Sequence, residues 1–218
     1  MSDTERTATT APAAAIADPA PLGLAAFALT TFLLSAKNAD WTRGTDAWLG
    51  YAFFYGGTVQ LLAGMWEFRN RNVFGATAFS TYGGFWMGLG VFVVLAHATS
   101  FIPTTPAYQL TSALAWFLFA FAVFNTYMLI ASMQVNTAVF MVFLTLEVTE
   151  ILLVIGFFNI SHGGTEWWLH AGGWAGIVTA GVAWYASAAG VWNGVSGRVM
   201  LPVGKPFTTA RARSVATA

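Results

Sequence analysis

Apolar residues along the chain gather in six long stretches, separated by short segments that hold most of the charged residues. A helix that crosses the roughly 30 Å apolar core of a bilayer needs about 20 such residues, at about 1.5 Å per residue. The pattern therefore predicts an all-α integral membrane protein, built as a six-transmembrane-helix bundle. The predicted spans are residues 22–36 together with the prolines that precede them, 48–68, 74–98, 109–130, 137–158 and 167–191.

Two polar segments flank the predicted bundle. Residues 1–17 are rich in Ala and Thr and lack the apolar core of a signal peptide, so they are predicted to form a disordered N-terminal tail. Residues 201–218 are predicted to form a C-terminal tail of the same kind. Because no soluble insert separates the spans, residues 18–200 are predicted to form one transmembrane domain.

Composition agrees with a membrane protein and excludes several classes of function. Of the 218 residues, 57% are apolar and 8% are charged, against roughly 25% charged in soluble globular chains. Nine Lys and Arg balance nine Asp and Glu, which leaves no basic surface for nucleic acid. With no cysteine and three scattered histidines, neither a metal site nor a cofactor is expected. The absence of hydrolase, zinc-protease and nucleotide-binding motifs argues against an enzyme.

Lys and Arg are distributed unevenly between the two predicted sides of the bundle. An even number of spans places both termini on one side, which would hold Arg6, Arg69, Arg71, Arg198, Lys205, Arg211 and Arg213. The other side would hold only Lys37 and Arg43. Because cytoplasmic loops retain basic residues, both termini are predicted to be cytoplasmic, in a multi-pass protein of the inner (plasma) membrane. Interfacial tryptophans are then predicted at Trp41, Trp48, Trp167 and Trp168 outside, and at Trp66 and Trp192 inside.

Polar residues inside the spans are mostly uncharged, and include Thr30, Thr31, Gln60, Thr81 and Asn125. Hydroxyl and amide groups can donate hydrogen bonds to a carboxylate without trapping it as a fixed positive charge would, which favours conduction of a small anion. The alternative is that these side chains only bond to the backbone of their own helices.

The segment Asp18-Pro-Ala-Pro-Leu-Gly-Leu24 marks the beginning of the first span. Asp18 is predicted to cap a helix whose first turn holds Pro19 and Pro21, since these prolines lack only N–H groups that would be unpaired there. Pro21 disfavours α conformation at Ala20, so an irregular helix start is expected. The positive end of the helix dipole would attract carboxylates near an aqueous mouth; a plain helix cap is the alternative.

Several motifs, in order along the chain, resemble those of the acetate uptake transporter family. DPAPLGL resembles the family's NPAPLGL signature and is followed by Phe27 and Thr30-Thr31. Further similar stretches are residues 54–57 with Tyr55, then Gln60, Glu67, residues 79–86 with Thr81 and Tyr82, His170, Gly173 and residues 197–204. The resemblance covers about residues 18–206.

This resemblance implies a fold and a function. The expected protein is a six-helix protomer with cytoplasmic termini, assembled as a hexamer in which each protomer has its own pore. The expected cargo is acetate and other short carboxylates, with succinate in some members, and transport in the family is described as proton-linked or as channel-like. Residues expected along the pathway are Thr30, Thr31, Tyr55, Gln60 and Thr81, with Asp18, Pro19, Pro21 and Gly23 at its mouth.

The family's narrow point is formed by a Phe, a Tyr and a Leu, which correspond here to Phe27, Tyr82 and Leu146. Counting from the predicted cytoplasmic end of each span places these three side chains roughly 9, 12 and 15 Å deep, near one level. The Tyr82 hydroxyl is expected to donate a hydrogen bond to the carboxylate.

Two departures from the family pattern concern acidic residues. Asp18 stands where the signature has Asn, which adds a negative charge on the expected route of an anion. Glu147 and Glu150 interrupt the fifth span, where burial of a carboxylate is costly, so both should face protein or water. Glu150 lies one turn beyond Leu146 on the same helix face and is the stronger candidate proton site. Glu147 is rotated by roughly 100°. Alternatively, both glutamates bond Tyr, Trp or Thr side chains of other helices.

One function of another class fits the same residues. An acetate-sensing membrane receptor would bind the carboxylate in the same place and signal through its tails without transport. The shortness of both tails argues against it.

Overall fold

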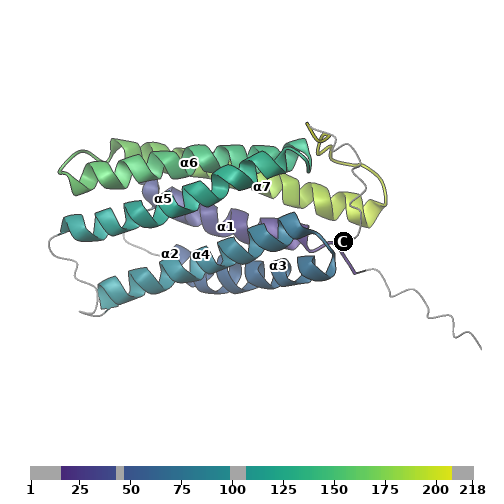
Figure 1. Cartoon of the computed structure of the whole chain (residues 1–218), viewed down its shortest axis with the longest axis horizontal. Helices are drawn as coiled ribbons and strands as arrows, with labels where there is room; N and C mark the ends of the chain where they lie inside the picture. Colours follow the sequence, from purple (N-terminus) through teal and green to yellow (C-terminus); the bar gives the residue numbers. More distant parts are fainter. Residues whose placement is uncertain (1–15, 43–46, 99–106, 208–218) are drawn as a thin grey trace, which may run out of the picture.

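The computed structural model describes residues 16–42, 47–98 and 107–207, and within them every regular element is a helix. The elements, shown in Figure 1, are α1 (Ala20–Asn38), α2 (Ala47–Phe53), the π-helix η1 (Phe54–Val59), α3 (Gln60–Arg69), α4 (Val73–Ala98), α5 (Ala107–Ser132), α6 (Thr137–Ser161) and α7 (Trp167–Ser196). By length and composition, α1, α4, α5, α6 and α7 can each cross a membrane. The predicted disordered tail lies almost entirely outside the described residues.

The predicted span over residues 48–68 corresponds to three consecutive elements, α2, η1 and α3, that continue one another. The π turn contains Gly56 and Gly57, and the Thr58 hydroxyl donates to the Phe53 carbonyl at 2.8 Å. A widened turn of this kind is rare and often marks a functional position. Here it directly precedes Gln60, which is almost fully buried.

The helices form an elongated bundle with α1 in its middle (Figure 1). Helix α1 packs along α7 on one side and against η1 and α3 on the other; α7 also packs along α6, α6 along α5, and α3 along α4. The Ser187 hydroxyl, in the last part of α7, donates to the Pro21 carbonyl at the start of α1 at 2.6 Å. Gly173, near the start of α7, faces Asn38 at the end of α1, so these two helices run antiparallel. Both described ends of the chain lie at the same end of the bundle.

Large apolar side chains cover the outside of the bundle. Phe54 is 74% exposed, Trp116 61% and Ile130 64%, whereas the buried positions are largely Ala, Gly and aromatic residues. This distribution suits a lipid solvent, in which tight helix contacts need small residues and the outer surface needs none of the polar groups that water would favour. The described structure is therefore that of a multi-pass membrane protein.

Five of the six tryptophans predicted at the membrane interfaces are exposed on the bundle. Trp41, Trp66, Trp167, Trp168 and Trp192 are exposed. Trp48, predicted at the outer membrane interface, is instead only 3% exposed and faces the interior, with the Lys37 ammonium 5.9 Å from the centre of its ring.

The start of α1 is more regular than predicted. The Ala20 N–H donates to the Asp18 carboxylate at 3.0 Å, as a cap would, but Ala20 is itself helical and Pro19 is the N-cap residue. Pro21 therefore does not displace Ala20 from helical geometry, because α conformation before proline is disfavoured but not forbidden.

The beginning of the predicted C-terminal tail is folded onto the bundle. The Ala138 N–H donates to the Val203 carbonyl at 2.9 Å, the Thr137 hydroxyl donates to the Lys205 carbonyl at 3.0 Å, and the Phe207 N–H donates to the Met133 carbonyl at 2.8 Å. Residues 203–207 thus complete the hydrogen bonding at the turn between α5 and α6. The rest of this predicted tail, residues 208–218, lies outside the described residues.

Replacing Gly173 by Ala is expected to destabilise the contact between α1 and α7. A Cβ there would lie 2.7 Å from the Asn38 carbonyl carbon and closer still to the Ala39 amide nitrogen, both of which are backbone atoms that cannot rotate away. Overpacking of this kind costs about 1–3 kcal/mol. Gly181→Ala on the same helix is the control, because its Cβ would meet only open space. Thermal unfolding in detergent should give a lower Tm for Gly173→Ala alone; equal values would contradict the close contact.

Candidate functional site

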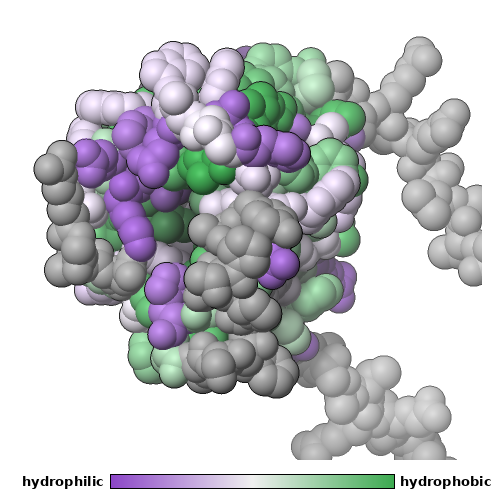
Figure 2. All heavy atoms as spheres, turned by 90° about the vertical axis from the view of Figure 1, so that its left-hand side faces the viewer, coloured by the Kyte–Doolittle hydropathy of each residue, from purple (hydrophilic) through white to green (hydrophobic). Residues whose placement is uncertain are grey.

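A cavity of about 260 Å³ lies inside the bundle, at the end away from the chain termini. Side chains from α1, α2, α4, α5, α6 and α7 line it, and they are mostly apolar. We call it the wide cavity. Seen from this end, hydrophilic residues gather around exposed apolar atoms (Figure 2).

A second cavity, of about 20 Å³, lies toward the termini and has room for about one water molecule. We call it the narrow cavity. Its own lining residues are Leu24, Gln60, Ala78, Phe79, Val142 and Phe143.

Three residues line both cavities: Phe27 of α1, Tyr82 of α4 and Leu146 of α6. They are 5%, 4% and 6% exposed, and the rings of Phe27 and Tyr82 meet edge to face with their centres 5.8 Å apart. The structure thus brings together three side chains from distant parts of the chain, in the boundary between the wide and narrow cavities. We call them the boundary ring.

Most buried polar groups in proteins have a hydrogen-bond partner, so an unpartnered buried polar atom that faces a cavity is a candidate contact for a ligand. In the wide cavity, three buried polar atoms have none: the hydroxyl oxygen of Thr31, the indole nitrogen of Trp86 and the Oε2 atom of Glu150. In the narrow cavity the Oε1 atom of Gln60 has none. Thr31 and Trp86 thus offer donors to a ligand.

The Tyr82 hydroxyl belongs to a buried polar network between α4, α5 and α6. It donates to the Asn125 amide oxygen at 3.0 Å. The Asn125 amide nitrogen donates to the Phe143 carbonyl at 3.0 Å and to the Glu147 carboxylate at 2.6 Å. The Thr126 hydroxyl donates to the other Glu147 oxygen at 2.7 Å. The Tyr82 proton is therefore engaged within the protein, and its donation to a carboxylate stays a prediction.

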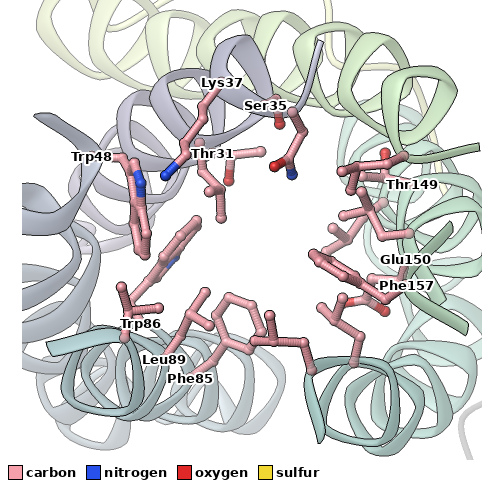
Figure 3. A pocket seen from close by; sticks show the side chains of 18 of the residues that line it. Thr31, Ser35, Lys37, Trp48, Phe85, Trp86, Leu89, Thr149, Glu150 and Phe157 are labelled. Atoms are coloured by element: carbon pink, nitrogen blue, oxygen red, sulfur yellow. The ribbon is translucent and has the colours of Figure 1, made fainter. Parts of the chain in front are cut away.

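The two glutamates of α6 have different surroundings. Glu147 lies between α5 and α6, where two side chains of α5 bond its carboxylate. Glu150 is 3% exposed and lines the wide cavity, where its nearest hydrogen-bonding partner is the Tyr82 hydroxyl at 3.5 Å. Figure 3 shows Glu150 on the wall opposite Lys37 and Trp48.

The wide cavity carries a positive charge near its mouth. Lys37 of α1 lines it, together with Asn38 and His97. Among the described residues, no three His, Asp or Glu side chains converge in a way that could hold a metal ion. An apolar chamber with a few buried polar groups is typical of a site for a small organic molecule.

Comparison with known proteins agrees with this geometry. The sequence profile of the GPR1/FUN34/yaaH family matches residues 2–205. The chain belongs to this family.

Relatives in the GPR1/FUN34/yaaH family include the succinate-acetate/proton symporter SatP of Escherichia coli, which is 34% identical over 195 residues, 87% of this chain and 96% of that protein. Accumulation of dyads protein 2 of Saccharomyces cerevisiae is 42% identical over 191 residues, 83% of this chain. The chain spans 63% of the length of that yeast protein.

A solved structure of the bacterial acetate channel SatP superimposes with a TM-score of 0.79 at 32% identity. The match covers 87% of this chain and all of that one. The helical bundle is therefore that of the GPR1/FUN34/yaaH family.

Some residues that the sequence assigned to the pathway line neither cavity. The Thr30 hydroxyl donates to the Ala26 carbonyl at 3.0 Å, and its side chain packs where a Cβ on Gly56 would lie. Tyr55 and Thr81 are half-buried and outside both linings. The predicted mouth residues Asp18, Pro19, Pro21 and Gly23 are also outside them; a Cβ on Gly23 would lie 2.7 Å from the Phe79 ring.

Sequence reasoning missed Trp86 and Lys37 as cavity residues. Trp86 is four residues after Tyr82, so helical periodicity places both on one face of α4, and this spacing was a usable signal. The sequence indicated Lys37 only as a basic residue at the outer end of the first span. No neighbouring residue indicates that the cavity extends as far as Lys37.

Proposed function

We propose that this protein moves acetate and related short-chain carboxylates, succinate among them, across the inner (plasma) membrane through the middle of a six-helix bundle. The observation that carries the proposal is the pair of unpartnered buried donors, Thr31 and Trp86, in an apolar cavity that the boundary ring separates from a second one. A carboxylate can accept from both donors while its short apolar part contacts the surrounding rings. The names of the SatP relatives support acetate and succinate as cargo and a proton as the co-substrate.

In this proposal the wide cavity faces the outside and the termini face the cytoplasm. Arg69 and Arg71 stand at the turn between α3 and α4, and Arg198 and Lys205 follow the end of α7, whereas Lys37 stands at the end of α1. The first two places lie at the end of the bundle with the termini (Figure 1), so the positive-inside rule supports this orientation. The segment formed by α2, η1 and α3 supplies the second of six spans. It is long enough to do so at about 1.5 Å per residue.

The proposed assembly is a hexamer with one pore in each protomer. Gly84 and Gly88 on the outer face of α4 support it, because open space surrounds the place where each Cβ would be. Such small-residue faces allow the close approach of another helix in lipid.

Along the proposed pathway, Phe27, Tyr82 and Leu146 form the narrow ring, while Thr31, Trp86 and Gln60 supply polar contacts on its two sides. Lys37 lines the outer mouth. Thr30 acts through packing between α1 and η1. Glu150, at the ring, is the candidate proton site, and Glu147 is held away from the cavity by α5.

Uptake of labelled acetate into liposomes that contain only the purified full chain tests the proposal. Uptake above that of empty liposomes is expected, and an imposed pH gradient separates proton-coupled transport from passive conduction. A folded protein that binds acetate but gives no uptake above empty liposomes would contradict transport and leave a receptor.

Leu146→Ala is expected to admit larger acids, because removal of the isobutyl group widens an apolar ring. The ratio of succinate to acetate uptake should rise severalfold. Leu153→Ala is the matched control, since Leu153 is also buried on α6 and lines the wide cavity but is not part of the ring. An equal fall of both substrates in Leu146→Ala alone, with normal folding, would argue against the ring as the size filter.

Trp86→Phe is expected to weaken acetate binding while an aromatic ring stays in place. Loss of one hydrogen bond to a charged group costs about 1.5–3 kcal/mol, so the KM for acetate should rise about tenfold or more. Trp116→Phe, on the exposed face of α5, controls for the loss of an indole elsewhere. If both variants keep the original KM, the Trp86 N–H does not contact the substrate.

A further inference from the structure

The direction of each hydrogen bond around Asn125 follows from its partners. Its amide nitrogen lies 3.0 Å from the Phe143 carbonyl oxygen and 2.6 Å from a Glu147 oxygen. A carbonyl oxygen only accepts, so the amide nitrogen is the donor on this side. The amide oxygen must then point toward the Tyr82 hydroxyl, 3.0 Å away. Asn125 is fully buried, so no water competes for these positions.

The Tyr82 hydroxyl has one proton, and Asn125 receives it. What the hydroxyl presents to its other neighbour is a lone pair. That neighbour is the Oε1 atom of Glu150, at 3.5 Å. An ionised Glu150 would set two acceptors against each other in a buried place and would leave its Oε2 atom without any donor. A protonated Glu150 has one donor. On Oε2 this proton lets the unpartnered atom donate into the wide cavity, and the Tyr82 lone pair then faces a neutral carbonyl oxygen in place of a charged carboxylate.

We propose that Asn125, anchored by the Phe143 carbonyl and Glu147, is a positioning residue that keeps the Tyr82 proton away from the cavity, so that protonated Glu150 donates the hydrogen bond to a carboxylate at the boundary ring. This inference rests on the proposed function and deepens it, since it assigns the donor. The bound carboxylate accepts from the Glu150 O–H; no bond is broken in this step.

Donation by Tyr82 itself would carry a larger penalty. The hydroxyl would have to turn away from Asn125, which would leave a buried amide oxygen unpaired, and an unpaired buried acceptor costs about as much as a hydrogen bond gains. Glu150 has no such commitment, because its Oε2 atom is buried beside the wide cavity without a partner.

Other titratable groups around Glu150 enter the interpretation of any pH profile. Lys37 of α1 and His97 of α4 line the same cavity toward its mouth. Tyr82 of α4 contacts Glu150, and Glu147 lies one turn away on α6. Among the side chains of α5 that the structure describes, that of Tyr127 titrates, and it is 53% exposed. The lining residues of α2 and α7, Trp48 and Leu169, do not titrate.

The test measures the KM for acetate in liposomes between about pH 5 and 8, corrected for uptake by empty liposomes because acetic acid itself titrates in the lower part of this range. Asn125→Leu frees the Tyr82 proton to turn toward Glu150 and stabilise its ionised form. The midpoint of the profile should move to lower pH by about one unit, with a KM raised about tenfold near neutral pH and unchanged at the acid end.

Thr126→Val is the matched control, since Thr126 bonds the same Glu147 from the same helix but does not contact Tyr82. Its midpoint should stay where it is in the wild type. Glu150→Gln should flatten the profile. Glu147→Gln should keep a pH-dependent profile, because Glu150 still titrates and the Phe143 carbonyl still holds the Asn125 amide. Equal shifts in Asn125→Leu and Thr126→Val would assign the effect to Glu147 and overturn the inference. An unshifted Asn125→Leu would overturn it as well.

A measurement without transport keeps the inference testable if Asn125→Leu does not fold. The infrared difference between wild type and Glu150→Gln, recorded below the midpoint pH, should contain the carbonyl band of a protonated carboxyl group that the variant lacks. Its absence would overturn the inference. If wild-type liposomes take up no acetate while this band is present, the proposed function fails and the hydrogen-bond arrangement stands.

Discussion

The row of glycines on α7 holds α1 in the middle of the bundle, and the rest of the site depends on that contact. Gly173 faces the backbone at Asn38 and Ala39, Gly176 faces Ser35, and Gly190 faces Pro21, so close approach continues along the whole of α1. In lipid, no hydrophobic force drives helices together, and van der Waals packing between small residues takes its place. Helix α1 then brings Phe27 of the boundary ring, Thr31 and Lys37 to the wide cavity.

Some polar groups inside the bundle are bonded by neighbouring helices. Asn125 bonds partners on α4 and α6, and the hydroxyls of Thr149 and Thr179 lie 3.0 Å apart between α6 and α7. Those beside the cavities, such as Thr31, Trp86 and Gln60, are left with unpaired atoms. Because a buried unpaired group is costly, these atoms beside the cavities support the proposed carboxylate site.

The boundary ring is an apolar barrier between the two cavities. Its side chains are two aromatic rings and one leucine, nearly all buried, with a cavity of about 260 Å³ on one side and of about 20 Å³ on the other. A bare anion crosses such an apolar passage only if something compensates the loss of its water. In the proposed transport, protonated Glu150, which lies beside Tyr82 and lines the wide cavity, supplies part of this compensation.

Hydropathy alone predicted the five longest helices, because the bilayer demands about 20 apolar residues per span regardless of tertiary partners; the predicted span 137–158, for example, is Thr137–Ser161 in the structure. It did not predict the π turn within 48–68. The family motifs also indicated Phe27, Tyr82 and Leu146, and the helix rise predicted that they lie near one level, because depth in a span depends only on the number of residues from its end. Only the tertiary structure decided which face of each helix turned inward. Trp48 is buried in the bundle, and the Thr30 side chain packs against Gly56. Residues 203–207 bond the turn before α6. In each case the partners lie on elements far away in the sequence. The different surroundings of Glu147 and Glu150 have the same origin: their three-residue spacing fixes the angle between them but not that α5 stands beside one and a cavity beside the other.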